Sequence, residues 1–347
     1  MDRLLKSTLS LSTTLEINFT EGLWLSAFEF LISCFGYAQH ALKPITLNSL
    51  VLLAISNTVF AQPITVTDDF DNTVSIPKPA DRIIALSPHS VEQLFSLGVG
   101  DNIIATITYA DYPQQAKSIK RIGDAMSINY EEIISLKPDL IVAWGKGTQQ
   151  TQIDRLKQLG IPVFLSGSES LKSIPSSLIR LGDLVGATGK AKHLVQQFQH
   201  RLEQFKNNVE QLKDSGDKTD KPRVFIQIWG SPIRTIGGGH LVDEIIGHCG
   251  GENIYHDHKQ SAPVVSVESL LKRNPQIAIL NNKKDGFSTG LSELIKPWMN
   301  IAAVKNNQIC RVDFDTLLRP TMRVLDGMGV VCGCIENYSD SNHPKPN

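Results

Sequence analysis

The sequence predicts an α/β protein in which two lobes, each built on a parallel sheet, are joined by one long helix. Three observations lead to this fold class: a long helical pattern near the middle of the chain, a segment that recurs on both sides of it, and short apolar strands that alternate with helices in both halves. Such alternation is typical of parallel sheets covered by helices.

The long helix is predicted over residues 190–212. Apolar residues recur there at steps of four and three and form one narrow face. These residues are Ala191, Val195, Phe198, Leu202, Phe205, Val209 and Leu212. Thr188 is a candidate N-cap, and Gly216 a candidate end. At about 35 Å, the helix is long enough to leave one small domain and enter another. An ordinary amphipathic helix within one domain is the alternative.

The segments on either side of this helix repeat one another. Glu131 and Glu268 each stand seven residues before a proline and ahead of a short apolar strand. Asn129 and Ser266 precede these glutamates by two residues as candidate N-caps. Each copy therefore predicts a helix, a tight turn and a buried strand, with chance matching of the turns as the alternative.

The other elements are placed from local patterns. Residues 64–76 alternate apolar and polar side chains around an Asp-Asn turn, which predicts a β-hairpin covering the first lobe. In the first half we expect strands at 82–86, 103–107 and 163–166 and helices at 91–97 and 174–185. In the second half we expect strands at 223–228 and 308–312, a helix at 241–249 and a final glycine-containing helix.

These elements predict a division of the chain into five parts. They are an N-terminal extension with a signal peptide (1–61), a first α/β lobe (62–187), the connecting helix (188–216), a second α/β lobe (217–338) and a frayed tail (339–347). The length of 347 residues is typical of two domains.

Composition and the N-terminal residues indicate the compartment. A net charge of −1 does not indicate binding to nucleic acid or to anionic lipid. Residues 45–61 form an apolar run that ends in Val-Phe-Ala, which resembles a cleavage site. This pattern predicts a signal peptide and a periplasmic location. A permanent membrane anchor is the alternative. Residues 1–42 are too long for an ordinary leader, so we expect the true start to lie further downstream. Four cysteines follow the run, and in an oxidising compartment they favour disulfides.

Aromatic side chains gather where the predicted strands end. Ser87, Tyr109, Tyr112 and Trp144 follow strands of the first half, and Trp229 follows a strand of the second. Ligands of open parallel sheets bind beyond the carboxyl ends of the strands. We therefore expect a ligand platform at this rim, with simple packing as the alternative.

Two candidate motifs for catalysis or metal binding are incomplete. The segment from Gly186 to Lys190 departs from a phosphate-binding loop. His256 and His258 lack a clear third metal ligand. We therefore expect neither an enzyme, nor a metal site, nor a cofactor.

Several motifs resemble one family of transport proteins. They are the hairpin at 64–76, Tyr109-Ala-Asp-Tyr-Pro113, Leu136-Lys-Pro-Asp-Leu140 and Cys249-Gly-Gly-Glu-Asn-Ile254. Together they resemble the periplasmic substrate-binding proteins of cobalamin (vitamin B12) ABC importers, a branch of a group that also binds siderophores and haem. The resemblance covers residues 64–338. It implies two Rossmann-like lobes joined by one rigid helix and a cleft between them. We expect the protein to be a monomer.

The resemblance also implies the roles of particular residues. Tyr109 and Trp144 would hold the corrin ring, and Asp315 and Arg319 would bind its amides. From their places at the strand ends, we also expect Ser87, Tyr112 and Trp229 to contact the ligand. Asp313 is the alternative to Asp315 as the ligand-facing acid.

Two further assignments concern the transporter and the cysteines. By the resemblance, Glu131 and Glu268 would dock the membrane subunits of the importer. Cys249 would pair with Cys332, with Cys334 as the rival partner and the pairing of Cys310 left open.

Two other functions remain as alternatives. The same fold could bind a ferric siderophore or haem, although the rim offers chiefly Arg234 and Arg319 as basic residues. A hydrolase or metal-dependent enzyme would need a nucleophile–base pair or a ligand triad, and the sequence shows neither.

Overall fold

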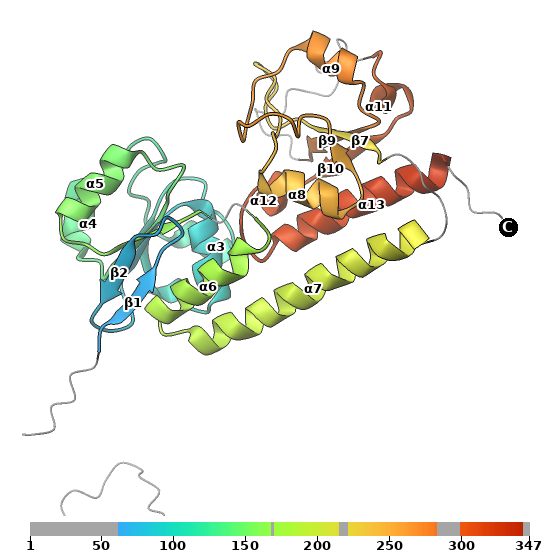
Figure 1. The fold of residues 1–347 in the computed structure, drawn as a ribbon. Helices are drawn as coiled ribbons and strands as arrows, with labels where there is room; N and C mark the ends of the chain where they lie inside the picture. The colour runs from blue at the N-terminus through green and yellow to red at the C-terminus, as the bar shows by residue number, and fades with distance from the viewer. Residues whose placement is uncertain (1–61, 168–169, 215–220, 283–298, 343–347) are drawn as a thin grey trace, which may run out of the picture. The chain divides into compact units, whose positions relative to one another are not determined.

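The protein consists of two α/β lobes, each built on a four-stranded parallel sheet (Figure 1). The computed structural model describes residues 62–167, 170–214, 221–282 and 299–342. The expected signal peptide, Gly216 and the residues after 342 lie outside these ranges. The predicted fold class is confirmed.

The first lobe contains a sheet with the strand order β4-β3-β5-β6. Its strands are β3 (Ile83–Leu86), β4 (Ile103–Thr106), β5 (Leu140–Trp144) and β6 (Val163–Ser166). Its helices are α3 (Pro88–Ser96), α4 (Tyr130–Leu136), α5 (Gln150–Gln158) and α6 (Ser173–Leu184), with 3-10 turns η1 (Gly100–Asn102) and η2 (Gln114–Ser118). Along β3, Ile83 and Ala85 enter one apolar core while Ile84 and Leu86 enter another. The strand is buried on both faces, which explains its continuous apolar sequence.

The predicted hairpin is confirmed and is tied to the first lobe. Strands β1 (Ile64–Thr67) and β2 (Thr73–Ile76) pair antiparallel. The Asp68 carboxylate accepts hydrogen bonds from the backbone N–H groups of Phe70 (2.8 Å) and Leu165 (3.2 Å). The first bond closes the turn, and the second fastens it to β6.

The connecting helix α7 (Thr188–Asp214) is longer than predicted. Thr188 lies inside the helix, and its hydroxyl donates to the Asp183 carboxylate at 2.6 Å. The prediction that it caps the helix was therefore wrong. Ala191 packs into a core of the first lobe and Phe198 into the core of the second. One continuous helix thus contributes to both lobes.

The second lobe repeats the layout with the strand order β10-β9-β7-β8. Its strands are β7 (Arg223–Ile226), β8 (Glu252–Asn253), β9 (Ile277–Asn281) and β10 (Ile309–Val312). Its helices are α8 (Leu241–His248), α9 (Val267–Arg273), α11 (Ala302–Lys305), α12 (Phe314–Leu317) and α13 (Val324–Asn342). Strand β8 was not predicted, because a strand of two residues is too short to show an alternation of apolar and polar side chains. Helix α13 continues past Tyr338, so the expected tail begins inside it.

The predicted internal repeat is confirmed in its two short helices, α4 and α9, which begin and end in the same way. Asn129 caps α4 by accepting from the backbone N–H of Glu132 at 3.0 Å, and Ser266 caps α9 in the same way. Both helices end in a left-handed residue: Lys137 has a φ of 46° and Asn274 a φ of 41°. This conformation ends the helix and turns the chain into the following strand.

An arginine at the start of β7, and one immediately before β3, binds the helix end in each copy of the repeat. The Arg82 guanidinium donates to the backbone carbonyl of Leu136 at 2.6 Å, and the Arg223 guanidinium donates to that of Asn274 at 3.0 Å. These carbonyls lie at helix ends, where backbone acceptors lack partners within the helix. The matched contacts show that the two halves share one local structure.

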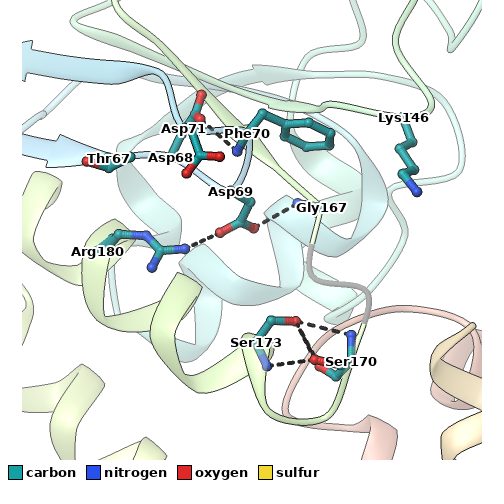
Figure 2. A pocket seen from close by; sticks show the side chains of 10 residues that line it. All are labelled: Thr67, Asp68, Asp69, Phe70, Asp71, Lys146, Gly167, Ser170, Ser173 and Arg180. Carbon is teal, nitrogen blue, oxygen red and sulfur yellow. Dashed lines mark hydrogen bonds and ion pairs between the residues drawn. The ribbon is translucent and has the colours of Figure 1, made fainter. Parts of the chain in front are cut away.

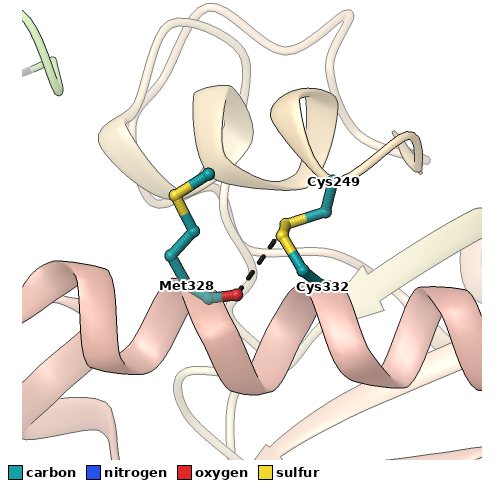
Figure 3. Close-up of a disulfide and its surroundings, with 3 residues drawn as sticks. All are labelled: Cys249, Met328 and Cys332. Atoms are coloured by element: carbon teal, nitrogen blue, oxygen red, sulfur yellow. Dashed lines mark hydrogen bonds between the residues drawn. A yellow bond between two sulfur atoms is a disulfide. The ribbon is translucent and has the colours of Figure 1, made fainter. Parts of the chain in front are cut away.

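Two disulfides fasten α13 to the rest of the second lobe. Cys249, just after α8, is joined to Cys332, which is the pairing expected from the resemblance (Figure 3). Cys310 of β10 is joined to Cys334, so the rival pairing of Cys249 does not occur.

We expect the Cys249–Cys332 bond to stabilise the fold more than the Cys310–Cys334 bond. The cysteines of the two bonds are 83 and 24 residues apart. Closing a longer loop removes more entropy from the unfolded chain, by roughly 1 kcal/mol here on a total of about 2–5 kcal/mol per bond. Chemical denaturation of the C249A/C332A double variant should show the larger loss in free energy of unfolding. The C310A/C334A variant is the matched control, and a larger loss in that control would contradict the prediction.

Candidate functional site

Three aromatic side chains stand exposed at the strand ends of the first lobe. Tyr109 is 72% exposed, Tyr112 46% and Trp144 43%. Tyr109 has a φ of 65°, in the left-handed region that non-glycine residues rarely adopt. Trp144 is the last residue of β5. Large aromatic surfaces left open to solvent in this way are suited to stacking on a flat ligand.

Trp144 is held in place by two neighbours. The His89 ring lies nearly perpendicular to the indole, with ring centroids 5.8 Å apart and planes at 87°. On another side Gly147 lies so close that any side chain there would overlap the indole. The orientation of the indole is therefore defined by the protein itself.

His89 is buried and held by hydroxyl groups. Its Nε2 atom lies 2.6 Å from Ser166 Oγ and 3.3 Å from Ser87 Oγ. Burial, reinforced by the positive charge of Arg319, lowers the pKa of His89 to about 3. The imidazole is consequently neutral at physiological pH, a role that the sequence analysis did not assign.

Ser87 has a different position from the one expected. It is fully buried, where its hydroxyl caps α3 by accepting from the backbone N–H of Ser90 at 3.2 Å. Pro88 follows it at a position that favours a helix start, so α3 begins earlier than the predicted residue 91. Ser87 is not exposed at the rim, and its expected place among the exposed ligand contacts was wrong.

The acid and the arginine expected from the second lobe form an ion pair. Arg319 Nη2 lies 2.6 Å from Asp315 Oδ1. Asp313 instead caps α12, since its carboxylate accepts from the backbone N–H of Asp315 at 2.9 Å. Of the two candidate acids, Asp315 is therefore the one that accompanies Arg319.

A third partner of this pair, Glu92 of α3, was missed in the sequence. Arg319 Nη1 lies 2.7 Å from Glu92 Oε1, and Arg323 Nη1 lies 3.2 Å from Glu92 Oε2. The Arg323 guanidinium also lies over the Tyr112 ring, 3.6 Å from its centroid. The available signal was a glutamate between Val91 and Leu94 on a short amphipathic helix, a position that implies a buried charge needing partners.

Trp229 provides an exposed aromatic surface in the second lobe. It is 40% exposed, and its indole N–H donates to the backbone carbonyl of Ser231 at 3.1 Å. Nearby, the Arg234 guanidinium donates to the carbonyl of Ala262 at 3.1 Å. The strand end of each lobe thus carries at least one exposed aromatic residue.

Glu131 and Glu268 are exposed in the first turns of α4 and α9. The pKa of the Glu268 carboxyl lies below its usual value, because its own backbone N–H and the Ser266 hydroxyl donate to it. The carboxylate is therefore charged at neutral pH and available to a cationic partner.

A hollow of about 520 Å³ lies beside the hairpin (Figure 2). The Asp69 carboxylate lines this hollow. It accepts a hydrogen bond from the Gly167 backbone N–H at 2.8 Å and forms an ion pair with Arg180. Phe70 fills space that side chains at Gly145 and Gly167 would occupy. The charged side chains at this hollow thus fasten the hairpin to the lobe.

Neither a metal cluster nor a membrane-spanning helix occurs in the described part of the chain. No group of three His, Cys, Asp or Glu residues among those placed could hold a metal ion. His256 Nδ1 lies 2.9 Å from the Asp243 carboxylate. No described helix is long and apolar enough to cross a bilayer.

Two α/β lobes sharing one long helix, with exposed aromatic residues at the strand ends of both, define a two-lobed solute-binding protein. The chain belongs to the periplasmic binding protein family, whose sequence pattern matches residues 83–316. It is 33% identical over 258 residues to the vitamin B12-binding protein of Vibrio cholerae, covering 74% of this chain and 89% of that one.

Solved structures agree with this assignment. The crystal structure of the periplasmic vitamin B12-binding protein BtuF of Vibrio cholerae has a TM-score of 0.67 at 31% identity, covering 75% of this chain and 98% of that one. A protein of Staphylococcus epidermidis described as a possible iron-binding, periplasmic solute-binding protein has a TM-score of 0.62 at 30% identity, covering 74% and 99%. Both relatives are described as binding proteins.

We expect His89 to make the stability of the protein depend on pH. The folded state keeps the imidazole neutral down to a pKa of about 3, whereas the unfolded chain takes up a proton below about pH 6.5. Protonation favours the unfolded state, so the stability contributed by this residue is lost as pH falls from 6.5 toward 3. Between pH 7 and pH 5 the loss should be about 2 kcal/mol.

Urea denaturation at both pH values measures this loss. His89→Gln keeps hydrogen-bonding groups without a titrating ring and serves as the control. It should lose about 2 kcal/mol less than the wild type over that range. Equal losses in the two proteins would show that His89 is not the responsible group.

Proposed function

We propose that this protein binds a corrinoid such as cobalamin between its two lobes and delivers it to an ABC importer. The observation that carries the proposal is the exposed trio Tyr109, Tyr112 and Trp144 beside the ionic group of Asp315 and Arg319. The similarity to vitamin B12-binding proteins supports the same ligand.

The chemistry of a corrinoid matches these residues. A corrin is a broad apolar ring edged by neutral amides, so its binding needs flat side chains for contact area and a few fixed polar groups for orientation. Tyr109 and Trp144 supply flat area with few rotatable bonds. Arg319 can donate to carbonyl or phosphate oxygens, and Asp315 can accept from amide N–H groups. Tyr112 and Trp229 add contact area at the edges.

Delivery requires export and a membrane partner. The apolar run at residues 45–61 supports export to the periplasm, which is the compartment named for the family and for BtuF. We further propose that the protein acts as a monomer, without a cofactor or catalytic activity, and passes its ligand to the membrane subunits of the importer.

A ferric siderophore or haem is the second candidate ligand. The similarity to the Staphylococcus epidermidis protein favours it. Anionic ligands need basic residues that can pair with them, yet Arg319 and Arg323 both contact Glu92. The remaining basic residue of the rim, Arg234, donates to the backbone carbonyl of Ala262. The corrinoid therefore fits the described residues better.

Titration with cyanocobalamin, haem and a ferric siderophore, followed by absorbance and tryptophan quenching, tests the ligand. We expect cyanocobalamin to bind at micromolar concentrations or below. Trp144→Ala should weaken its binding by about 1–3 kcal/mol, as the loss of a large contact does. Trp144→Phe keeps most of the contact area and should retain most of the affinity. A wild type that binds haem or a siderophore but not cyanocobalamin would contradict the proposal.

We propose Glu131 and Glu268 as the docking carboxylates for the importer. They occupy equivalent places in the repeat, one on each lobe, and both are exposed. Reversing both charges (E131K/E268K) should abolish transport into cells that carry the importer, while cyanocobalamin affinity stays unchanged. The control E132K alters the next residue of α4, whose carboxylate pairs with Lys120 within the lobe. Loss of ligand affinity in the double variant would assign these residues a structural role instead.

A further inference from the structure

The carboxylate of Glu92 is buried where the two lobes meet. Its side chain is only 2% exposed, and both oxygens are engaged. One oxygen contacts Arg319 at 2.7 Å, and the other contacts Arg323 and the Thr321 hydroxyl, each at 3.2 Å. A carboxylate can be kept charged in such a place only by partners of opposite charge.

Glu92 contributes charge to a group that reaches the proposed ligand site. Arg319 also pairs with Asp315, whose side chain is 36% exposed, and Arg323 stacks on the half-exposed Tyr112. Within this group of four, the positive charges of Arg319 and Arg323 are matched by the negative charges of Glu92 and Asp315. Neither arginine therefore presents an uncompensated charge to the ligand.

The link between helix α3 and residues 319–323 does not depend on the charge of Glu92. Its neighbour Gln93 donates a neutral side-chain hydrogen bond to the backbone carbonyl of Pro320 at 3.0 Å. This bond joins α3 to the same segment that carries Arg319. The negative charge of Glu92 thus adds an electrostatic effect to a contact that Gln93 already makes.

We propose that Glu92 determines which ligand charge the site accepts, favouring an uncharged macrocycle over an anionic one by compensating Arg319 and Arg323. The inference rests on the proposed function, in which the ligand lies against Tyr112 and Arg319. Removing the negative charge would leave an excess positive charge beside the ligand, and a carboxylate-bearing ligand would gain from it. A neutral ligand would gain little.

The test compares cyanocobalamin, which is uncharged overall, with haem, which carries two carboxylates. Affinities of both ligands are measured for the wild type and for Glu92→Gln at one ionic strength. The haem-to-cyanocobalamin affinity ratio should rise about five- to thirty-fold in the variant, as expected for one unit charge about 8 Å away at an effective dielectric constant of about 20–40. The rise should shrink at high salt. An unchanged or lowered ratio overturns the inference.

Removing one arginine supplies the matched control. Arg323→Gln alone should shift the ratio in the opposite direction, and E92Q/R323Q should return it toward the wild-type value. If Glu92 had only a structural role, both affinities would fall together in Glu92→Gln and the double variant would not recover, which also overturns the inference. The opposite shift in Arg323→Gln remains measurable should Glu92→Gln fail to fold.

The two proposals can fail separately. A wild type that does not bind cyanocobalamin counts against the proposed function. The change in haem affinity between wild type and Glu92→Gln still decides the role of Glu92.

Discussion

The continuity of helix α7 is the constraint on which the two-lobe arrangement depends. Because Ala191 belongs to a core of the first lobe and Phe198 to the core of the second, the helix cannot bend between them without disturbing packing on both sides. Close-packed interiors tolerate such disturbance poorly. The direct contacts of Glu92 with Arg319 and Arg323 also join the lobes, through side chains distant in sequence.

The fold could be predicted largely because its signals are local. The long helix showed a sustained apolar face, the hairpin alternated, and the repeat placed Asn129 and Ser266 at the helix starts that the structure confirms. Errors arose where a tertiary contact replaced the local signal. Thr188 bonds to Asp183 instead of capping α7, and strand β8 is defined only by its pairing with β7.

The candidate site could be predicted only in part, for a related reason. The rule that ligands bind at strand ends identified Tyr109, Tyr112 and Trp144, which the structure leaves exposed. The rule cannot tell an exposed side chain from a capping one, so Ser87 was misplaced. Glu92 and Arg323 were missed because their pairing joins α3 to a segment more than two hundred residues away. No sequence period indicates such a contact.

The two lobes differ in their dependence on thiol oxidation. Both bonds lie in the second lobe and both end on α13, while the described residues of the first lobe contain no cysteine. Under reducing conditions the described residues of the first lobe have no disulfide to lose, whereas the second lobe would lose both covalent links to α13. Without these bonds, non-covalent contacts alone would hold α13 against the rest of the second lobe.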